Sequence, residues 1–318
     1  MLRWVLAAGL MVPLVVGCGS SPDSTSSSKF LVSTSLYPIA EIVQRVGGDS
    51  VEVVNLTPPG TDAHDVELTA KQAQRLEQSD VVFYFGDNFQ PSVEKAIEAL
   101  GDVPRVDLFD SVELLSASLG SFGVETHDDE HGHADDERDP HVWLDPANMI
   151  AMTKTVASTL SQLQPENARE ISTNSTEYIA ELTELGNLLD TEIGLVPGKM
   201  WSRCDDVNFY TAHQGFRYLA ERAGLNLVPI AGINPDQQVS AQYLESLSDG
   251  LKGKDVTIFY ESLISSSAAQ ALATSLKVKT DVLNPVEGLT QKEIDTGTTY
   301  ISAQRDNIQK IAKGLRCS

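Results

Sequence analysis

The chain is long, strongly acidic and moderately apolar. It has 318 residues, of which 41% are hydrophobic, and a formal net charge of −22 at pH 7. The excess of carboxylates argues against nucleic acid or an anionic lipid surface as a partner, because both require basic patches on the protein. The length is sufficient for one large domain or for two lobes.

The N-terminal segment is predicted to be a targeting signal. Arg3 precedes an almost wholly apolar run, residues 4–16, which is short for a membrane span. The run leads into Leu-Val-Val-Gly-Cys, which resembles the bacterial lipobox and predicts an acylated Cys18. We therefore expect a lipoprotein signal peptide over residues 1–17, a Ser-rich tether over 18–28, and an extracytoplasmic protein anchored to the cell membrane. A plain signal peptide with an incidental cysteine is the alternative.

Strand-like and helix-like segments alternate along the rest of the chain. Short apolar runs are expected to be strands, and most are followed by a stretch with helical spacing. This alternation predicts an α/β fold with parallel-type sheets flanked by helices. The expected strands are residues 30–32, 51–56, 81–85, 208–210, 227–230, 256–260 and 277–283, and the expected helices are 38–46, 68–76, 92–100, 215–223, 243–251, 265–276 and 300–315.

One long helical segment separates the two halves. It begins at Pro165 with a proline followed by an acid, and apolar residues then recur at steps of three and four until a Pro-Gly pair ends the pattern. We expect a linking helix within residues 165–196. It would join an N-terminal α/β lobe, residues 29–164, to a C-terminal α/β lobe, residues 197–318.

The six histidines of the chain fall into two groups. Three lie in an acidic segment, residues 125–138, which has one alanine as its only apolar residue and is predicted to be a loop that gathers metal weakly. The members of this group are His127, His131 and His133. The alternative is an acidic solvated loop without a role. The other three histidines stand alone in loops or at strand ends, where α/β proteins place their ligands: His64, His141 and His213.

Two cysteines remain if Cys18 is acylated. An even pair in an exported protein predicts a disulfide, here between Cys204 and Cys317, with two free thiols as the alternative. Neither cysteine lies in a C-x-x-C motif or beside a histidine, so we do not expect a cysteine metal site.

Four motifs resemble those of the bacterial zinc- and manganese-binding solute-binding proteins of ABC importers, and the ZnuA-like zinc group most closely. They are P-G-T-D-A-H (residues 59–64), D-P-H-V-W-L-D-P (139–146), A-H-Q-G-F-R-Y-L-A (212–220) and I-F-Y-E-S (258–262). The likeness runs from about residue 29 to the C-terminus. It implies the fold of a cluster A-I type solute-binding protein, in which one long rigid helix joins two lobes and the metal lies in the cleft between them.

The resemblance also implies a set of metal ligands. His64 and His141 would come from the first lobe and His213 from the second. The family often has an aspartate where this chain has Asn284, so we expect Glu287 to be the fourth ligand, with Asn284 or a water molecule as alternatives. A third imidazole favours zinc, because oxygen-rich sites suit manganese better.

The function that the resemblance implies is zinc import. The chain would capture Zn²⁺ as cargo and deliver it to an ABC-transporter permease, acting as a monomer and without catalysis. A binding protein for manganese or another divalent metal is the alternative. A zinc-dependent hydrolase is less favoured because the chain has no H-E-x-x-H pair, and an adhesin is a further, less favoured alternative.

Overall fold

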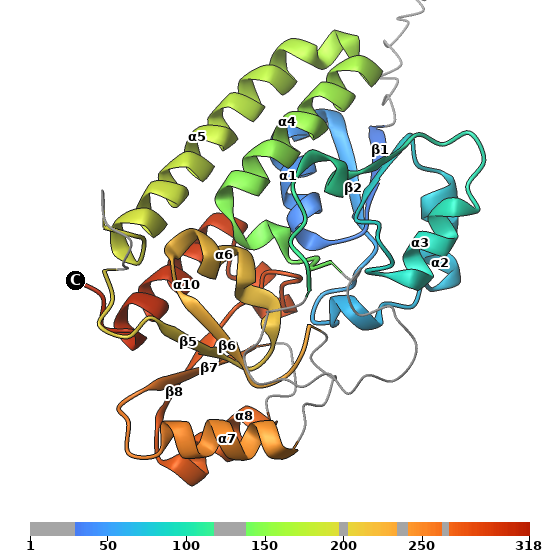
Figure 1. Cartoon of the computed structure of the whole chain (residues 1–318). Coiled ribbons are helices and arrows are strands. Elements are labelled where there is room, and N and C mark those ends of the chain that lie inside the picture. Colours follow the sequence, from blue (N-terminus) through green and yellow to red (C-terminus); the bar gives the residue numbers. More distant parts are fainter. Residues whose placement is uncertain (1–28, 118–137, 197–202, 234–240, 263–266) are drawn as a thin grey trace, which may run out of the picture.

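The computed structural model describes residues 29–117, 138–196, 203–233, 241–262 and 267–318. They form two α/β lobes, each built on a four-stranded parallel sheet (Figure 1). The strand order is β2-β1-β3-β4 in the first lobe and β6-β5-β7-β8 in the second, so the two sheets share one topology. Because all strands of a sheet are parallel, their carboxyl ends lie at one edge, and ligands of such sheets bind just beyond that edge.

The first lobe contains the elements of the N-terminal half. Its two central strands, residues 30–34 and 81–84, are mostly apolar and almost wholly buried, as expected for parallel strands covered on both faces. The strands are β1 (Phe30–Thr34), β2 (Val51–Asn55), β3 (Val81–Tyr84) and β4 (Arg105–Asp107). The helices are α1 (Tyr37–Gly47), α2 (Ala70–Glu77), α3 (Pro91–Glu98) and α4 (Pro146–Leu163).

The second lobe repeats this arrangement. Its strands are β5 (Asn208–Thr211), β6 (Asn226–Pro229), β7 (Thr257–Glu261) and β8 (Lys279–Leu283). Its helices are α6 (Arg217–Ala223), α7 (Ala241–Leu251), α8 (Ser267–Leu276), α9 (Gln291–Asp295) and α10 (Tyr300–Gly314). Helix α10 begins with a capping box, in which Thr299 and Ser302 satisfy each other's free backbone N–H groups.

Helix α5 (Ala168–Glu192) connects the lobes and, with 25 residues, is the longest of the described helices. A 3-10 turn, Pro165–Asn167, leads into it. Its apolar face packs on α4 and α1 of the first lobe and on α10 of the second. Figure 1 shows α5 running beside α4 along one side of the molecule. A connector packed on both lobes restricts their relative motion.

The hydrophobic core is continuous between the lobes. One cluster of buried side chains extends from the first sheet through α4 and α5 to the second sheet. Trp143 and Tyr300 are fully buried within it, and the Tyr300 hydroxyl donates a hydrogen bond of 2.5 Å to the Trp143 carbonyl. Packing of this density gives the lobes a preferred relative position.

Most of the predicted strands and helices are present, within a few residues of their expected bounds. Three elements were not predicted: the three-residue strand β4, helix α4 and the short helix α9. Apolar residues of α4 such as Ile150 and Ala157 lie outside its fully buried face, so the helical periodicity of apolar residues is weak there.

Two further expectations concern the covalent and membrane properties of the chain. The predicted disulfide is confirmed, because Cys204 is bonded to Cys317 and closes a loop with a sequence separation of 113. Among the described residues, none of the helices combines the length and the apolar character that crossing a membrane requires.

Candidate metal centre

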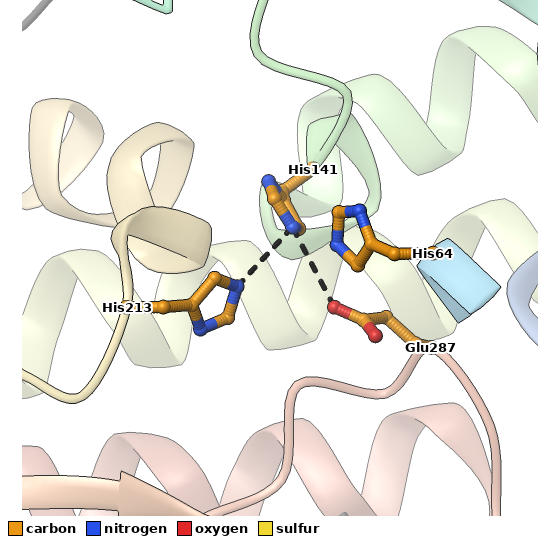
Figure 2. A group of neighbouring side chains, drawn as sticks. All are labelled: His64, His141, His213 and Glu287. Carbon is orange, nitrogen blue, oxygen red and sulfur yellow. Dashed lines mark hydrogen bonds and ion pairs between the residues drawn. The ribbon is translucent and has the colours of Figure 1, made fainter. Parts of the chain in front are cut away.

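Four side chains from distant parts of the chain meet between the lobes. They are His64, His141, His213 and Glu287 (Figure 2). Each contributes one candidate ligand atom, and these four atoms all lie within 4.8 Å of one another. Three of the residues are buried and His64 is partly exposed.

The first lobe contributes His64 and His141. His64 lies in a 3-10 turn, Ala63–Asp65, beyond β2, and the Asp62 carboxylate caps this turn by accepting from the His64 backbone N–H at 2.9 Å. His141 lies just before a second 3-10 turn, Val142–Leu144.

The second lobe contributes His213 and Glu287. His213 follows β5 directly and precedes the 3-10 turn Gln214–Phe216. Glu287 lies in the loop that follows β8. Both residues therefore lie beyond the carboxyl ends of parallel strands, where the topology predicts ligand binding.

The spacing of the candidate ligand atoms suits a small tetrahedral ion. His213 Nε2 lies 3.3 Å from His141 Nε2, and His141 Nε2 lies 3.5 Å from Glu287 Oε1. In a tetrahedral zinc site with bonds of about 2.0–2.1 Å, ligand atoms are roughly 3.3 Å apart. These two separations already match that value.

Two of the histidines each contact a carboxylate through Nδ1, the ring nitrogen that faces away from the cluster. Asp139 Oδ1 lies 2.7 Å from His141 Nδ1 and also accepts from the His141 backbone N–H at 3.0 Å. Glu261 Oε2 lies 2.5 Å from His213 Nδ1. In both rings the Nδ1 atom is engaged, which leaves Nε2 for the cluster.

Burial and neighbouring charges shift the pKa values of the cluster in different directions. Burial, together with the neighbouring imidazoles, lowers the pKa of His64 to about 2, so this ring is neutral. Burial alone would lower the pKa of His213, but the Glu261 carboxylate outweighs it and raises the value to about 9. Burial raises the pKa of Glu287 to about 8, with Asp62 adding to the shift.

The raised pKa values of His213 and Glu287 accord with an excess of buried carboxylates around the cluster. Asp139, Glu261 and Glu287 are all buried around the cluster, whereas no lysine or arginine is buried among the described residues. Buried carboxylates are costly unless they are paired or bind a cation. The donor set therefore fits a divalent cation, which would replace the protons that His213 and Glu287 otherwise hold.

The loop that carries Glu287 is fastened to both lobes. Asn284 and Asn307 exchange two hydrogen bonds within the second lobe, of 2.9 and 2.7 Å. Across the lobes, the Trp143 indole N–H donates to the Pro285 carbonyl at 2.8 Å, and the Gly60 N–H donates to the Leu289 carbonyl at 3.0 Å. The position of Glu287 therefore depends on contacts from the opposite lobe.

Asn284, an alternative fourth ligand from the sequence, is engaged elsewhere. Its side-chain oxygen accepts from the Val286 N–H at 2.8 Å, and its amide donates to Glu293 Oε1 at 2.8 Å. Val286 has a positive φ of 57°, which is unusual for a β-branched residue. The Asn284 side chain thus supports the strained turn that precedes Glu287 and does not join the cluster.

A glycine leaves room for the His213 ring. A Cβ added at Gly215 would lie 2.6 Å from both Cε1 and Nε2 of His213, and 3.3 Å from Cδ2 of His141. The backbone of Gly215 therefore lies so close to the His213 ring that any side chain at position 215 would force the ring or the backbone to move.

The structure brings together the three isolated histidines and Glu287, but other predicted site residues are not among those it describes. His127, His131 and His133 lie outside the described residues, and so does Cys18. The contacts of Asp139 and Glu261 with the ligand rings were not predicted from the sequence. A glutamate at the end of a strongly apolar strand was the available signal for Glu261.

Two α/β lobes on a long connecting helix, with a buried cluster of imidazoles and a carboxylate between them, define the class of metal-binding solute-binding proteins. The chain matches the model of the family described as "ZnuA: Zinc-uptake complex component A periplasmic" over residues 32–314. The chain belongs to this family of zinc-uptake binding proteins.

Individual relatives agree with this assignment. The chain is 32% identical over 327 residues to the high-affinity zinc uptake system protein ZnuA of Bacillus subtilis (strain 168), covering 98% of this chain and 96% of that protein. It is 30% identical over 312 residues to the zinc-binding lipoprotein AdcA of Streptococcus pneumoniae (strain ATCC BAA-255 / R6), covering 96% of this chain. It spans only 60% of AdcA, which is a longer protein.

Solved structures share the fold. The Zn(II)-bound ZnuA-like domain of Streptococcus pneumoniae AdcA superposes with a TM-score of 0.72 at 28% identity, covering 91% of this chain and 99% of that one. The metal-dependent lipoprotein YcdH of Bacillus subtilis gives a TM-score of 0.72 at 31% identity, covering 90% and 99%. The laminin-binding protein Lbp of Streptococcus pyogenes is 22% identical and shows the fold alone.

Proposed function

We propose that this chain captures Zn²⁺ between its lobes as cargo and delivers it to the permease of a zinc ABC importer. The observation that carries the proposal is the meeting of three imidazoles and one carboxylate, from both lobes, within 4.8 Å. His64, His141, His213 and Glu287 are the proposed ligands. Membership of the zinc-uptake family supports the same function.

The composition of the cluster supports zinc over manganese and capture over catalysis. Imidazole-rich sites favour zinc, whereas manganese is better matched by oxygen ligands. A catalytic zinc keeps one coordination position for water or substrate, usually with three protein ligands. Four candidate protein ligands would fill all four positions of a tetrahedral zinc, so the cluster suits a carrier better than a hydrolase.

A cavity beside the cluster offers a route for the metal. It has a volume of about 400 Å³, and its lining includes His64, Asp139 and, from the second lobe, Ile233. His64 is the one candidate ligand that is partly exposed. We therefore expect zinc to reach His64 first and then to contact the more deeply buried ligands.

The proposed location is the outer face of the cell membrane. Acylation of Cys18 would anchor the chain, and the Ser-rich residues 19–28 would let the two lobes stand away from the bilayer. As a monomeric carrier on such a tether, the chain would remain close to its permease. Metabolic labelling with a fatty acid tests the anchor, and a Cys18→Ala variant should lose the label.

The test of the metal site uses two matched triple variants. Native mass spectrometry would follow the chain equilibrated with competing zinc and manganese. We expect the wild type to retain one zinc ion, and the His64→Ala/His141→Ala/His213→Ala variant to lose it. The His127→Ala/His131→Ala/His133→Ala variant should retain it. Loss of the tightly held zinc only in the second variant would place the site in the acidic segment and overturn the proposal.

A weak gathering role is proposed for residues 125–138. Three histidines among several acids provide low-affinity positions that raise the local concentration of zinc. Deletion of this segment should slow zinc uptake at scarce metal but leave uptake at abundant metal unchanged. Equal uptake at scarce zinc, with and without the segment, would contradict this role.

A further inference from the structure

Glu261 is a buried carboxylate whose role the metal-ligand set does not explain. It is the last residue of β7, a strand of otherwise uncharged residues, and is 2% exposed. Its backbone pairs with Leu283 in the parallel ladder between β7 and β8. The backbone position is therefore set by the sheet, and the side chain extends from the carboxyl end of the sheet toward the metal cluster.

The contacts of this carboxylate point to one partner. Oε2 lies 2.5 Å from Nδ1 of His213, which is itself 1% exposed. Among the described residues, neither oxygen of Glu261 has any other hydrogen-bond partner. A carboxylate removed from water to this extent costs several kcal/mol unless a partner compensates. A role limited to anchoring β7 would require contacts to the backbone or to other strands, and those are not observed for its side chain.

The contact with Nδ1 determines which face of the ring is available. A carboxylate on one ring nitrogen holds the proton there and leaves the opposite nitrogen as the electron-pair donor. In His213 the opposite nitrogen, Nε2, lies 3.3 Å from His141 Nε2 within the cluster. Glu261 therefore sets the orientation of the ring and keeps a proton on Nδ1, so that zinc displaces only the proton on Nε2.

The same arrangement occurs once on each lobe. In the first lobe Asp139 holds Nδ1 of His141 at 2.7 Å, and in the second Glu261 holds Nδ1 of His213. For His64 the Nε2 atom has no hydrogen-bond partner within the described part of the chain. Two ligands are thus fixed before metal arrives, and the third is held mainly by packing against Phe89.

We propose that Glu261 is a positioning residue of the metal centre, which holds His213 in its metal-binding tautomer through Nδ1. This inference rests on the proposed zinc-binding function. Removal of an outer-layer partner of this kind typically weakens metal affinity about 10–100-fold. Glu261→Ala should show that loss. Glu261→Gln should show a smaller one, because the amide oxygen can still accept from Nδ1–H.

The experiment compares full-length wild type, Glu261→Ala, Glu261→Gln and a control, Glu41→Gln. Glu41 is also a largely buried carboxylate. It accepts a hydrogen bond from the Tyr37 hydroxyl and has no contact with the cluster. Competition with a chelating indicator gives the zinc dissociation constants, and circular dichroism checks folding. We expect wild type and Glu41→Gln to bind zinc equally tightly, Glu261→Gln to bind it more weakly, and Glu261→Ala to bind it most weakly. If Glu261→Ala does not fold, the zinc affinity of Glu261→Gln relative to that of the wild type tests the proposal.

A spectroscopic readout separates positioning from simple stabilisation. The ¹⁵N resonance of His213 Nδ1 should shift in both Glu261 variants and not in Glu41→Gln, with or without zinc. Unchanged zinc affinity together with an unchanged Nδ1 resonance would overturn the proposal. If the wild type itself does not bind zinc, the proposed function fails, and the Nδ1 resonance of the zinc-free protein alone decides the role of Glu261.

Discussion

At the residue scale, the candidate metal centre depends on small features next to its ligands. His213 is held on one side by Glu261 and has Gly215 on the other, where a Cβ would approach the ring to 2.6 Å. The ring therefore has little freedom to turn. Local geometry of this kind makes the metal centre sensitive to single atoms near His213.

Gly215→Ala tests this sensitivity directly. The added methyl group must displace His213, so we expect zinc affinity to fall by at least about 10-fold. Gly250→Ala is the matched control, because a Cβ at Gly250 would meet no atom within 4 Å. Competition titrations with a chelating indicator measure both variants. Equal zinc affinity of Gly215→Ala and wild type would show that the ring can shift without loss.

Proton release is the second prediction at this scale. His213, with its pKa raised to about 9, and Glu287, with its pKa raised to about 8, both hold protons in the zinc-free protein at pH 7. Zinc must displace these protons, so its apparent affinity should increase as the pH rises from 7 to 9. Calorimetry in buffers of different ionisation enthalpy measures the release. A binding enthalpy that does not depend on the buffer would contradict the prediction.

At the scale of elements, the loop after β8 places the fourth candidate ligand. Asn284 supports the turn at Val286 by accepting a hydrogen bond from its backbone N–H. The positive φ of Val286 costs about 1–3 kcal/mol of conformational energy, which such contacts must offset. In the prediction from the sequence, Asn284 was an alternative fourth ligand. In the structure both ends of its side-chain amide are used by Val286 and Glu293.

Asn284→Asp distinguishes support of the loop from ligation. An aspartate cannot donate to Glu293 and places a like charge beside it, so we expect a loss of about 1–3 kcal/mol in the free energy of unfolding and weaker zinc binding. Asn187→Asp on the exposed face of α5 is the control and should change stability by no more than about 0.5 kcal/mol. Urea denaturation and zinc titration measure the two effects. Tighter zinc binding by Asn284→Asp would indicate that position 284 reaches the metal.

At the scale of the whole molecule, zinc binding and lobe contact are linked. The loop of Glu287 belongs to the second lobe but accepts hydrogen bonds from Trp143 and Gly60 of the first. Trp143 lies two residues after His141, so one short segment contributes both a candidate ligand and an inter-lobe contact. Separation of the lobes would break this contact and withdraw Glu287, which offers a route for releasing zinc to a permease.

Trp143→Phe tests this link. The variant loses the indole N–H and leaves the buried Pro285 carbonyl without that donor. The free energy of unfolding should therefore fall by about 1–3 kcal/mol, and zinc should dissociate faster because the lobes are held together less firmly. Phe85→Leu is the control, because Phe85 stacks on Trp143 in the same aromatic group, is not among the residues that line the cavity beside the cluster, and makes no side-chain hydrogen bond to the loop. Stopped-flow mixing with excess chelator gives the dissociation rates. An equal increase of the zinc dissociation rate in both variants would show that lost aromatic packing, and not the lost hydrogen bond, causes the faster release.

The sequence by itself determined the α/β class, the long helix between the halves and the disulfide. Buried parallel strands such as β3 are almost wholly apolar, and α5 repeats its buried residues at steps of three and four from Ile171 to Leu189, so the local pattern suffices for both. Helix α4 was missed because apolar residues such as Ile150 and Ala157 lie outside its fully buried face and weaken the helical periodicity. Resemblance to a family, rather than spacing, selected the three isolated histidines.

The tertiary structure alone decided how the site is assembled. His64 and Glu287 are more than two hundred residues apart, and no local pattern specifies that their side chains meet. The contact of His213 with Glu261 likewise follows from the pairing of β5 with β7, and the contact of Asn284 with Glu293 follows from the position of α9 beside the loop after β8. Periodicity reports which face of an element is buried, whereas convergence of ligands depends on contacts between elements that are remote in sequence.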